Sequence, residues 1–483
     1  MKTSLIALTT LVLLCACHKN GKHDTTDSNV APYFKDILVN EKYANGSLAS
    51  FQHALGYFSL KGSPNTQIMV ASRGKDELSD ARGFRIASIN KTNGTVNWIK
   101  SYDLDDKYYI QLATCAAMDN SGNIWVGGHS FDGNGVAGIL FMAKLDTAGN
   151  MLWSQSFSNY QGWRAYSLTA LANGDLALMA KGFGGLVVLR LTTNMQSVWS
   201  TIVYYMNSHI DNDYYGSVAS ILSPENHAMA ETADGSIFFA TSSNPGTHTG
   251  GVDRLYKLDA GGQLQFAKTY TLDGNQGVVR PVQLINAGVN RLLMADQAFP
   301  ISSVGPCPFF TMLSLDGNVV ASRGRPLDQS GSPGLNINQV NFYQDHIYYS
   351  TCGDYSFNTY ILDTALGLKN TVVTAAALDI GTDRGGISLF DEADKALYYV
   401  LNFGGNYGES NGFEVTRNDA SGKPCINTYT VPPATLLLGD NHITVANDTT
   451  ITSTTYGPAV IFTPLSWRRY QVPVTVTENV CGN

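Results

Sequence analysis

A possible nucleophile motif lies near the C-terminal third of the chain. Residues 408–412, GESNG, match the pattern G-x-S-x-G, in which a strained strand-to-helix turn lifts a serine hydroxyl beside a histidine. The motif lies in FGGNYGESNG and is followed by FEVTRND, which has no helical pattern. A hairpin loop rich in Gly and Asn explains the same residues, so we expect no catalytic serine.

Two acidic loops carry the hard oxygen ligands that calcium prefers. One contains Asp103, Asp105 and Asp106, and the other contains Asp211 and Asp213. Neither loop has the D-x-D-x-D-G spacing with a distal Glu, and solvated carboxylates beside aromatic residues explain both. No Cys or His pair has zinc spacing, and the eight Glu are too scattered to indicate a glycosidase pair, although Asp from different repeats could serve. We expect no catalytic residue, no metal and no cofactor.

Aromatic residues near these loops are the best indication of binding. They are Tyr102, Tyr108, Tyr109, Tyr160, Trp163, Tyr204, Tyr205, Tyr214 and Tyr215. Aromatic faces beside Asp and Asn suit stacking on sugars or contact with a protein partner. The alternative is that these rings cover the edges of the fold.

The N-terminus reads as a removable export signal. Residues 1–16 hold one Lys and an apolar run from Leu5 to Leu14, which is too short to span a bilayer. The end of this run, LCAC, resembles the bacterial lipobox. The resemblance implies cleavage before Cys17, acylation of Cys17 and a lipid anchor in the cell envelope, at the outer membrane and facing the periplasm or the surface. An ordinary secretory signal is the alternative, and residues 17–31 read as a flexible tether.

Composition favours strands and excludes several classes of protein. Charged residues make up 14% of the 483 residues, Gly numbers 47 and the net charge is −8. Asp far outnumbers Glu, which favours turns over helices. A helical bundle and a disordered chain are excluded, and the negative charge argues against a nucleic-acid partner.

A hairpin of two strands around an Asp/Asn–Gly turn recurs seven times along the chain. The copies are 84–102, 140–157, 186–205, 254–270, 309–325, 358–374 and 413–429. Trp98, Trp153 and Trp199 hold one position, and Phe266 replaces Trp in the fourth copy. We expect this aromatic residue to pack on the adjacent repeat.

A short apolar strand precedes each hairpin, as in GNIWVGGHS (122–130), and we place one inner strand between the two elements. Seven repeats of about four strands predict an all-β fold, a seven-bladed β-propeller. Closure of the ring needs a strand from residues 32–60 or from the Thr/Val-rich tail 440–479, which reads as two to four strands. The expected domains are the propeller, 32–430, and a C-terminal β segment, 431–483, that packs on it or closes it.

One repeat resembles a known family. Residues 118–157, MDNSGNIWVGGHSFDGNGVAGILFMAKLDTAGNMLWSQSF, resemble the β-propeller repeats of bacterial secreted and surface proteins, with the pattern GNIYVTG…KLDxxGNxLW. The resemblance implies the fold and says little about function, because this architecture hosts enzymes, binders and scaffolds. The chain also resembles quinoprotein propellers but lacks a tryptophan-docking motif in every repeat, so no quinone is expected.

Five cysteines remain after processing besides Cys17. Cys115 lies in an apolar strand, which predicts a buried thiol. A disulfide between Cys425 and Cys481 would hold the tail on the last repeat; a bond between Cys307 and Cys352 stays open, as does the alternative that all five are reduced.

These observations lead to a lipid-anchored envelope propeller that acts as a binding or scaffold module for a glycan or an envelope protein. The alternative is a polysaccharide-degrading hydrolase or lyase with acidic residues at the propeller centre.

Overall fold

The computed structural model describes residues from Phe34 to Val480 with gaps, and residues 1–33 and 481–483 lie outside the described part. The longest gaps are 40–53, 73–82, 205–227, 244–251, 325–338, 376–385, 404–411 and 420–437. The chain divides into Met1–Pro32 and Tyr33–Asn483, and every described strand belongs to the second unit. No helix in the described ranges is long and apolar enough to cross a membrane.

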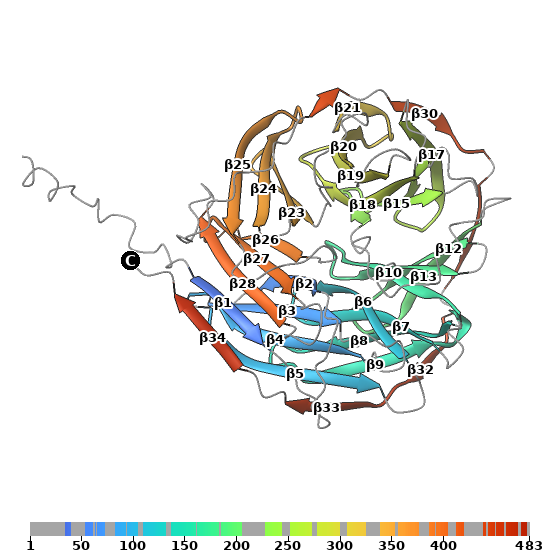
Figure 1. The fold of residues 1–483 in the computed structure, drawn as a ribbon. Helices are drawn as coiled ribbons and strands as arrows, with labels where there is room; N and C mark the ends of the chain where they lie inside the picture. Colours follow the sequence, from blue (N-terminus) through green and yellow to red (C-terminus); the bar gives the residue numbers. More distant parts are fainter. Residues whose placement is uncertain are drawn as a thin grey trace, which may run out of the picture. The chain divides into compact units, whose positions relative to one another are not determined.

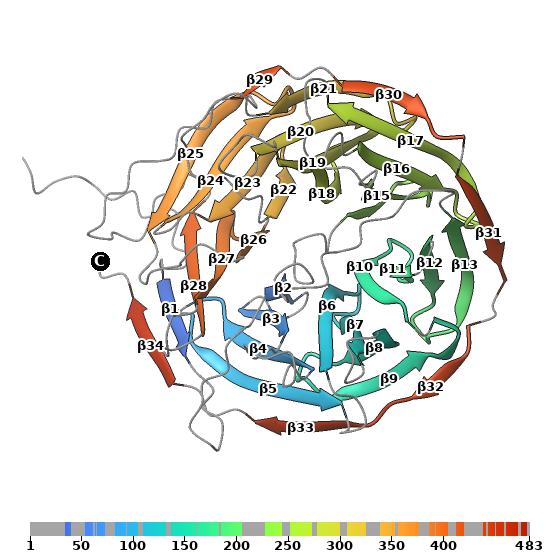
Figure 2. The ribbon, with the colours of Figure 1, turned by 45° about the vertical axis from the view of Figure 1, so that its right-hand side comes forward.

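The second unit is a ring of seven antiparallel sheets, numbered here as blades 1 to 7 (Figures 1 and 2). Blade 1 contains β2 (Ala54–Ser59), β3 (Thr66–Ser72), β4 (Phe84–Asn90) and β5 (Val96–Leu104); blade 2 contains β6 (Ile110–Met118), β7 (Ile124–Phe131), β8 (Ala137–Leu145) and β9 (Met151–Phe157), followed by the 3-10 turn η2 (Ser158–Tyr160). Blade 3 contains β10 (Arg164–Ala170), β11 (Leu176–Gly182), β12 (Gly185–Leu191) and β13 (Ser197–Tyr204); blade 4 contains β14 (Met229–Glu231), β15 (Ile237–Ser243), β16 (Val252–Leu258) and β17 (Leu264–Leu272).

The remaining blades complete the ring. Blade 5 contains β18 (Val278–Asn286), β19 (Arg291–Phe299), β20 (Cys307–Ser314) and β21 (Val319–Gly324); blade 6 contains β22 (Gln339–Tyr343), β23 (His346–Cys352), β24 (Ser356–Asp363) and β25 (Leu368–Ala375); blade 7 contains β26 (Gly386–Asp391), β27 (Ala396–Phe403), β28 (Gly412–Asp419) and β1 (Phe34–Val39). The predicted all-β, seven-bladed propeller is therefore confirmed.

The order of strands within a repeat differs from the expectation in one respect. The inner strand comes before the apolar second strand, not between that strand and the hairpin. In blade 3, for example, β11 ends at Gly182 and β12 begins at Gly185, which leaves no room for a strand. Only the inner strand's pairing partner identifies it, because its sequence is short and less regular.

Ring closure uses the N-terminal strand. β1 pairs with β28 over the register Lys35↔Thr416 to Val39↔Gly412 and so becomes the fourth strand of blade 7. The expectation that 413–429 is a complete hairpin was therefore wrong, because the strand beside β28 comes from the other end of the chain. The closing strand thus comes from the first candidate, residues 32–60, whose second apolar stretch forms the inner strand β2 of blade 1. The tail 440–479, the other candidate, adds strands to the outside of blades instead.

The C-terminal tail forms a belt around the outside of the ring (Figure 2). The belt strands are β29 (Gly439–Asp440), β30 (Ile443–Asn447), β31 (Thr452–Tyr456), β32 (Phe462–Pro464), β33 (Trp467–Gln471) and β34 (Thr475–Val480). They pair in turn with the outermost strands of blades 5, 4, 3, 2, 1 and 7. The tail thus forms six described strands rather than two to four, and it covers sheet edges that would otherwise be open to unwanted pairing.

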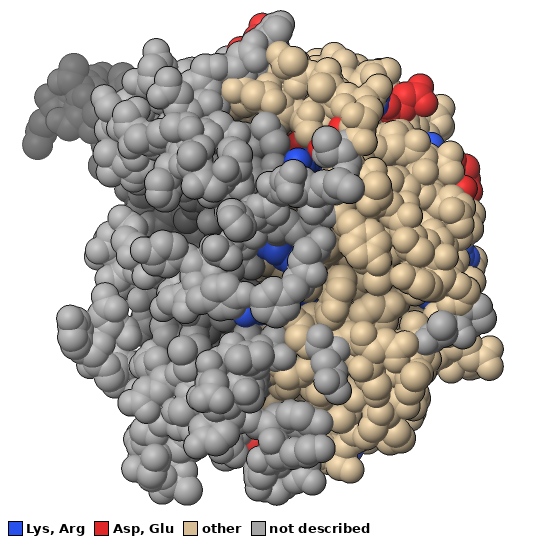
Figure 3. Space-filling model, turned by 90° about the vertical axis from the view of Figure 1, so that its right-hand side faces the viewer, with Lys and Arg blue, Asp and Glu red and all other residues tan. Residues whose placement is uncertain are grey.

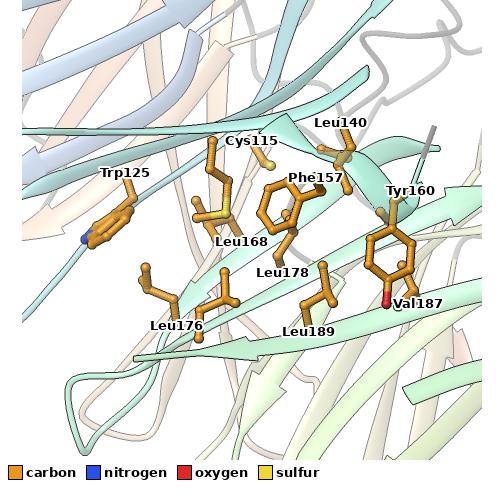
Figure 4. Packing of buried hydrophobic residues seen from close by; sticks show 14 of the residues in the cluster. Cys115, Trp125, Leu140, Phe157, Tyr160, Leu168, Leu176, Leu178, Val187 and Leu189 are labelled. Carbon is orange, nitrogen blue, oxygen red and sulfur yellow. The ribbon is translucent and has the colours of Figure 1, made fainter. Parts of the chain in front are cut away.

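The core consists of apolar layers between neighbouring blades. At the junction of blades 2 and 3, residues including Trp125, Leu140, Phe157 and Leu189 are fully buried together (Figure 4). The second and third strands supply most of these layers, which explains their nearly continuous apolar sequence.

The repeated aromatic residue of the fourth strand packs on the next blade, as predicted. A Cβ added to Gly149 of blade 2 would lie 2.9 Å from Trp98 of blade 1. The Trp199 indole donates a hydrogen bond to the Ala260 carbonyl of blade 4 at 3.0 Å, and Phe266 of blade 4 lies against Gly317 of blade 5. The turns of blades 2, 4 and 5 therefore dock on an aromatic ring of the preceding blade.

Candidate functional site

Strand direction divides the connections between two faces of the ring. First and third strands run one way and second and fourth strands run back, so the tight turns leave from one face, called the turn face. The second-to-third and blade-to-blade connections leave from the other face, called the connection face. The longer connections join strand ends on that face, including 205–228 between β13 and β14 and 325–338 between β21 and β22.

The turn face is built from short, hydrogen-bonded reverse turns. In blade 2 the backbone N–H of Asp146 donates to the Asn150 carbonyl at 3.0 Å, and the Asp146 carboxylate accepts the backbone N–H groups of Ala148 and Asn150. Gly149 takes the left-handed conformation with φ at 70°. Such turns are structural, and their acids are engaged in holding the turn.

The aromatic residues singled out from the sequence divide into two groups. Tyr102 is fully buried in β5 and stacks on Phe84 with ring centroids 4.9 Å apart. Tyr160 is buried and contacts Trp163 edge to face at 5.6 Å, and Tyr160 lies in the junction of blades 2 and 3 (Figure 4). The binding interpretation was therefore wrong for Tyr102 and Tyr160, which are buried in the fold. Trp163 is partly buried against the junction of blades 2 and 3, and its binding role stays a prediction.

The remaining aromatic residues of the set keep their predicted binding role. Tyr204 ends β13 and is 37% exposed. The other five lie in the gaps 105–109 and 205–227, outside the described residues: Tyr108, Tyr109, Tyr205, Tyr214 and Tyr215. For these residues the prediction of a binding role stays a prediction.

Most of the remaining sequence candidates also lie outside the described residues. Asp103 is in β5, but Asp105, Asp106, Asp211, Asp213 and residues 408–411 of GESNG are not described, and neither is Cys17. Within the described ranges no group of three or more His, Cys, Asp or Glu is arranged to hold a metal ion.

The structure decides some of the cysteine predictions and leaves others open. Cys115 is a fully buried thiol, as predicted, and burial raises its pKa to about 12. Cys307 is also a buried thiol, so the open possibility of a bond to Cys352 is not realised. Cys425 and Cys481 lie outside the described residues. β28 precedes Cys425 and β34 precedes Cys481; these two strands run in the same direction with β1 between them, so both end at the same edge of blade 7. The Cys425–Cys481 disulfide stays a prediction, to be tested by non-reducing peptide mapping.

The innermost strands bring few carboxylates to the centre of the ring. Among their described residues only Glu231 of β14 and Asp391 of β26 are acidic. Glu231 accepts the backbone N–H of Ala172 at 2.5 Å. Asp391 is paired with Lys91 at 2.7 Å. Both end their strands toward the turn face and serve junctions between blades.

The described surface carries few charges. In the view of Figure 3, isolated Lys or Arg and Asp or Glu side chains are scattered over a mostly uncharged surface. This part of the molecule therefore offers no concentration of one sign of charge for a highly charged partner.

A buried pair of carboxyl groups is the most unusual site in the described chain. Asp253 of β16 and Asp296 of β19 are 1% and 0% exposed and are in hydrogen-bonding contact across the junction of blades 4 and 5. Burial raises the pKa of both carboxyl groups well above the usual value, and the charge of Asp253 raises that of Asp296 further. Two such groups cannot both ionise cheaply, so they retain a proton.

The pair lies on the faces where the two sheets meet. Leu255, two residues after Asp253, and Met294, two residues before Asp296, belong to one apolar cluster between blades 4 and 5. Because side chains two residues apart share a face of a strand, both carboxyl groups point into the same junction. The site is a polar pair above an apolar layer.

Comparison between blades shows that the pair breaks the repeat. Asp253 lies six residues before the first residue of its turn, and the other blades have Phe84, Leu140, Leu186, Pro308, Phe357 and Phe413 at this position. Asp296 lies at a second-strand position that the other blades fill with Ala71, Gly128, Ala180, Thr241, Thr351 and Leu401. One carboxyl thus replaces an apolar side chain and the other a mostly small one.

Sequence reasoning missed this pair. An alignment of the seven repeats in the strand register would have revealed Asp253 as an acid at an otherwise apolar position. The contact with Asp296 needed the structure, because it joins different repeats.

Similarity to known proteins is confined to solved structures. No protein-family model and no curated protein matches the chain. Among solved structures, the polysaccharide lyase Uly1 is similar at 11% identity over 80% of this chain and 99% of that chain, with a TM-score of 0.45. The GH93 alpha-L-arabinofuranosidase of Fusarium graminearum, solved with arabinobiose, is similar at 10% identity over 80% and 98%, with a TM-score of 0.41.

A third similar structure is the β-propeller domain of the Trilobed protease from Pyrococcus furiosus, at 10% identity over 77% of this chain and 96% of that chain, with a TM-score of 0.41. With TM-scores below 0.5, the assignment rests on the sheet topology of this chain, in which seven antiparallel sheets form a ring. The fold is a β-propeller.

Proposed function

We propose that the protein is a lipid-anchored propeller of the bacterial cell envelope whose connection face binds a glycan or an envelope protein, with a glycan favoured. The observation that carries the proposal is the asymmetry of the ring. The turn face is made of short turns whose polar groups bond to each other, whereas the longer connections leave from one face. Binding residues concentrate on such loops when a rigid scaffold positions them.

The composition of those connections supports a carbohydrate ligand. The connection 205–228 contains Tyr205, Tyr214 and Tyr215 together with Asn and Asp, and 105–109 contains Tyr108 and Tyr109. Aromatic faces stack on sugar rings, and side-chain amides and carboxylates accept or donate hydrogen bonds to hydroxyl groups.

The rival function is a polysaccharide hydrolase or lyase with acidic residues at the centre. The described inner strands do not favour it, because Glu231 and Asp391 are committed to neighbouring groups. The Asp253–Asp296 pair is buried between sheets and has no exposed surface to offer a substrate.

A glycan-binding screen with a soluble fragment that begins at residue 24 tests the proposal, since this fragment keeps every described residue. Changing Tyr214 and Tyr215 to Ala should weaken binding about tenfold or more, as loss of aromatic anchors does. Val289→Ser is the control, because Val289 is 88% exposed on the turn face. Equal loss in both variants contradicts the proposed face, and release of sugar products from bound polysaccharide favours the enzyme.

The membrane anchor is a separate part of the proposal. The LCAC sequence and the tether without aliphatic residues before Val30 support acylation of Cys17. Growth with a labelled fatty acid should label the wild-type protein and leave Cys17→Ala unlabelled and released from the membrane. Label on the Cys17→Ala protein contradicts the anchor and leaves the binding proposal untouched.

A further inference from the structure

We propose that Asp253 and Asp296 form a proton-dependent latch between blades 4 and 5: a shared proton joins the two sheets, and its loss separates them at the connection face. This inference is independent of which ligand the connection face binds. It rests on the position of the pair in the repeat, on its burial at an interface and on what surrounds it.

Position within the ring is the first argument. At the junction of blades 2 and 3, the equivalent residues Leu140 and Ala180 are both fully buried in one apolar cluster. An apolar pair of this kind holds two sheets together at any pH. At the junction of blades 4 and 5 the same positions hold two acids, so the strength of this junction depends on their protonation.

The surroundings leave the pair no compensating charge among the described residues whose contacts are known. On β17, Tyr270 faces the junction, and its hydroxyl donates to the Gly317 carbonyl at 2.6 Å. Lys268 shares this face, but its ammonium group binds the Asp316 carbonyl at 2.5 Å and Asn318 Oδ1 at 2.9 Å.

The other neighbouring elements carry three further charged or titratable residues near the pair. On β16, Arg254 is paired with Asp448 of the belt at 2.9 Å. On β20, the buried thiol of Cys307 is aligned with Ala298, two residues beyond Asp296. On β18, Arg280 is aligned with Gln297, one register position from Asp296. Among the described residues no N–H or hydroxyl group donates to Oδ1 of Asp253 or to either carboxyl oxygen of Asp296, so the contact that these oxygens have is with the opposing carboxyl group.

A hydrogen bond between two carboxyl groups needs a proton on one of them. When the second carboxyl ionises, the two like charges repel in a site with little water, and water must enter to solvate them. The strand ends nearest the pair are followed by the connections 244–251 and 300–306, because β15 ends at Ser243 and β19 ends at Phe299. Separation of the sheets would therefore act first on that part of the connection face.

The sign of the pH effect follows from the raised pKa of the pair. Stability from the protonated pair is complete below the ordinary Asp pKa of about 4 and is lost as pH rises toward the folded-state pKa. Over that window the folding equilibrium constant falls up to about tenfold for each pH unit and each retained proton.

The test compares the full chain with Asp253→Leu/Asp296→Ala, which copies Leu140 and Ala180. Denaturant unfolding at pH 4 to 9 should show the wild type losing stability relative to the variant as pH rises. Amide hydrogen exchange of 252–258 and 291–299 should become faster in the wild type over the same range, after correction for intrinsic rates, while 185–191 of blade 3 stays protected. If denaturant unfolding is irreversible, the amide hydrogen-exchange rates alone decide whether the junction weakens with pH.

Asp253→Asn is a second variant that keeps a hydrogen-bond donor and removes the second ionisation. The stability of this variant should fall less steeply than that of the wild type as pH rises. Identical pH dependence in the wild type and the double variant overturns the latch. Stabilisation of the wild type alone by calcium chloride at pH 8 also overturns it, because the pair would then bind a cation instead of a proton.

Discussion

Trp199 joins two blades through a single ring. It is 4% exposed, donates to the Ala260 carbonyl and lies against Gly262 in the turn of blade 4. Gly262 has φ at 83°, and a Cβ there would lie 2.6 Å from the indole. The glycine is therefore required twice, for its conformation and for the closeness of the ring.

A pair of glycine variants separates these two requirements. Gly174→Ala should cost about 1 kcal/mol, because φ is 92° but the nearest side-chain atom is 3.7 Å from the new Cβ. Gly262→Ala carries the same conformational cost and should lose about 1–3 kcal/mol more through overpacking on Trp199. Denaturant midpoints measure both, and equal losses would contradict the docking of the turn on the indole.

Lys91 closes the junction between the first and last blades with charge. It is 4% exposed, and its ammonium group lies 2.7 Å from Asp391 and 2.9 Å from Asp394. Asp391 also accepts a hydrogen bond from Ser59 of blade 1. Burial would raise the Asp391 pKa, but the bonds from Lys91 and Ser59 outweigh burial and lower it.

Replacing Lys91 with Met should cost about 3–5 kcal/mol, because Asp391 would stay buried without its partner. The lowered pKa means that the wild-type pair stabilises the fold above the ordinary Asp pKa and loses this contribution as pH falls below about 4. The variant should lose less stability in that acid range. Lys369→Met is the control. The Lys369 side chain is 55% exposed in its ion pair with Asp363, so this substitution should lower the free energy of unfolding by less than about 1 kcal/mol.

At the scale of elements, the belt adds one strand to the outside of each of six blades. The belt strands alternate partly buried and exposed residues, as in β31, which suits a strand with one face on the ring and one in water. The Trp467 ring of β33 packs edge-on against Phe84 of blade 1 and Phe141 of blade 2, with ring centroids 5.1 and 5.4 Å apart. One belt residue thus bridges two blades.

Trp467→Ala should therefore destabilise the protein by about 2 kcal/mol, less than a fully buried Trp because its ring is only partly buried. Thermal unfolding with and without the substitution measures the change. Ile461→Ala, at a belt position that is 60% exposed, should change little. If both substitutions have equally small effects, the belt is dispensable for stability.

At the scale of the whole molecule, both ends of the propeller chain meet in blade 7. β1 lies between β28 and β34 and pairs with both. The ring is therefore closed by a strand that is far in sequence from its partners, and the belt adds a second closure outside it. Such a topology predicts a single cooperative unfolding transition for the ring.

Deletion of residues 34–39 tests this closure. The deletion removes two ladders at once, and at about 1 kcal/mol net for each lost hydrogen bond the loss should exceed about 5 kcal/mol. We expect calorimetry to show a much lower and broader transition, or an insoluble product. Deletion of 18–31, which lies outside the propeller unit, is the control and should leave the transition unchanged. An unchanged transition after loss of β1 would show that the blades are stable without closure.

The sequence by itself determined the all-β class, the seven repeats and most strand pairs. These features are local: alternating or continuous apolar strands, Asp–Gly turns and a Trp at one position of the hairpin, each encoded within about 20 residues. The docking of Trp98 and Trp199 on the next blade followed from the same pattern.

Tertiary structure alone decided the rest. The choice of β1 to close the ring and the path of the belt depend on pairing between residues more than a hundred positions apart, which local propensity does not encode. The inner strand pairs locally, but its sequence alone did not mark it as a strand. Nor did the sequence alone indicate the Asp253–Asp296 contact. Each acid alone could be a solvated turn residue in the sequence, and only the packing of one blade on the next removes both from water and brings their carboxyl groups together.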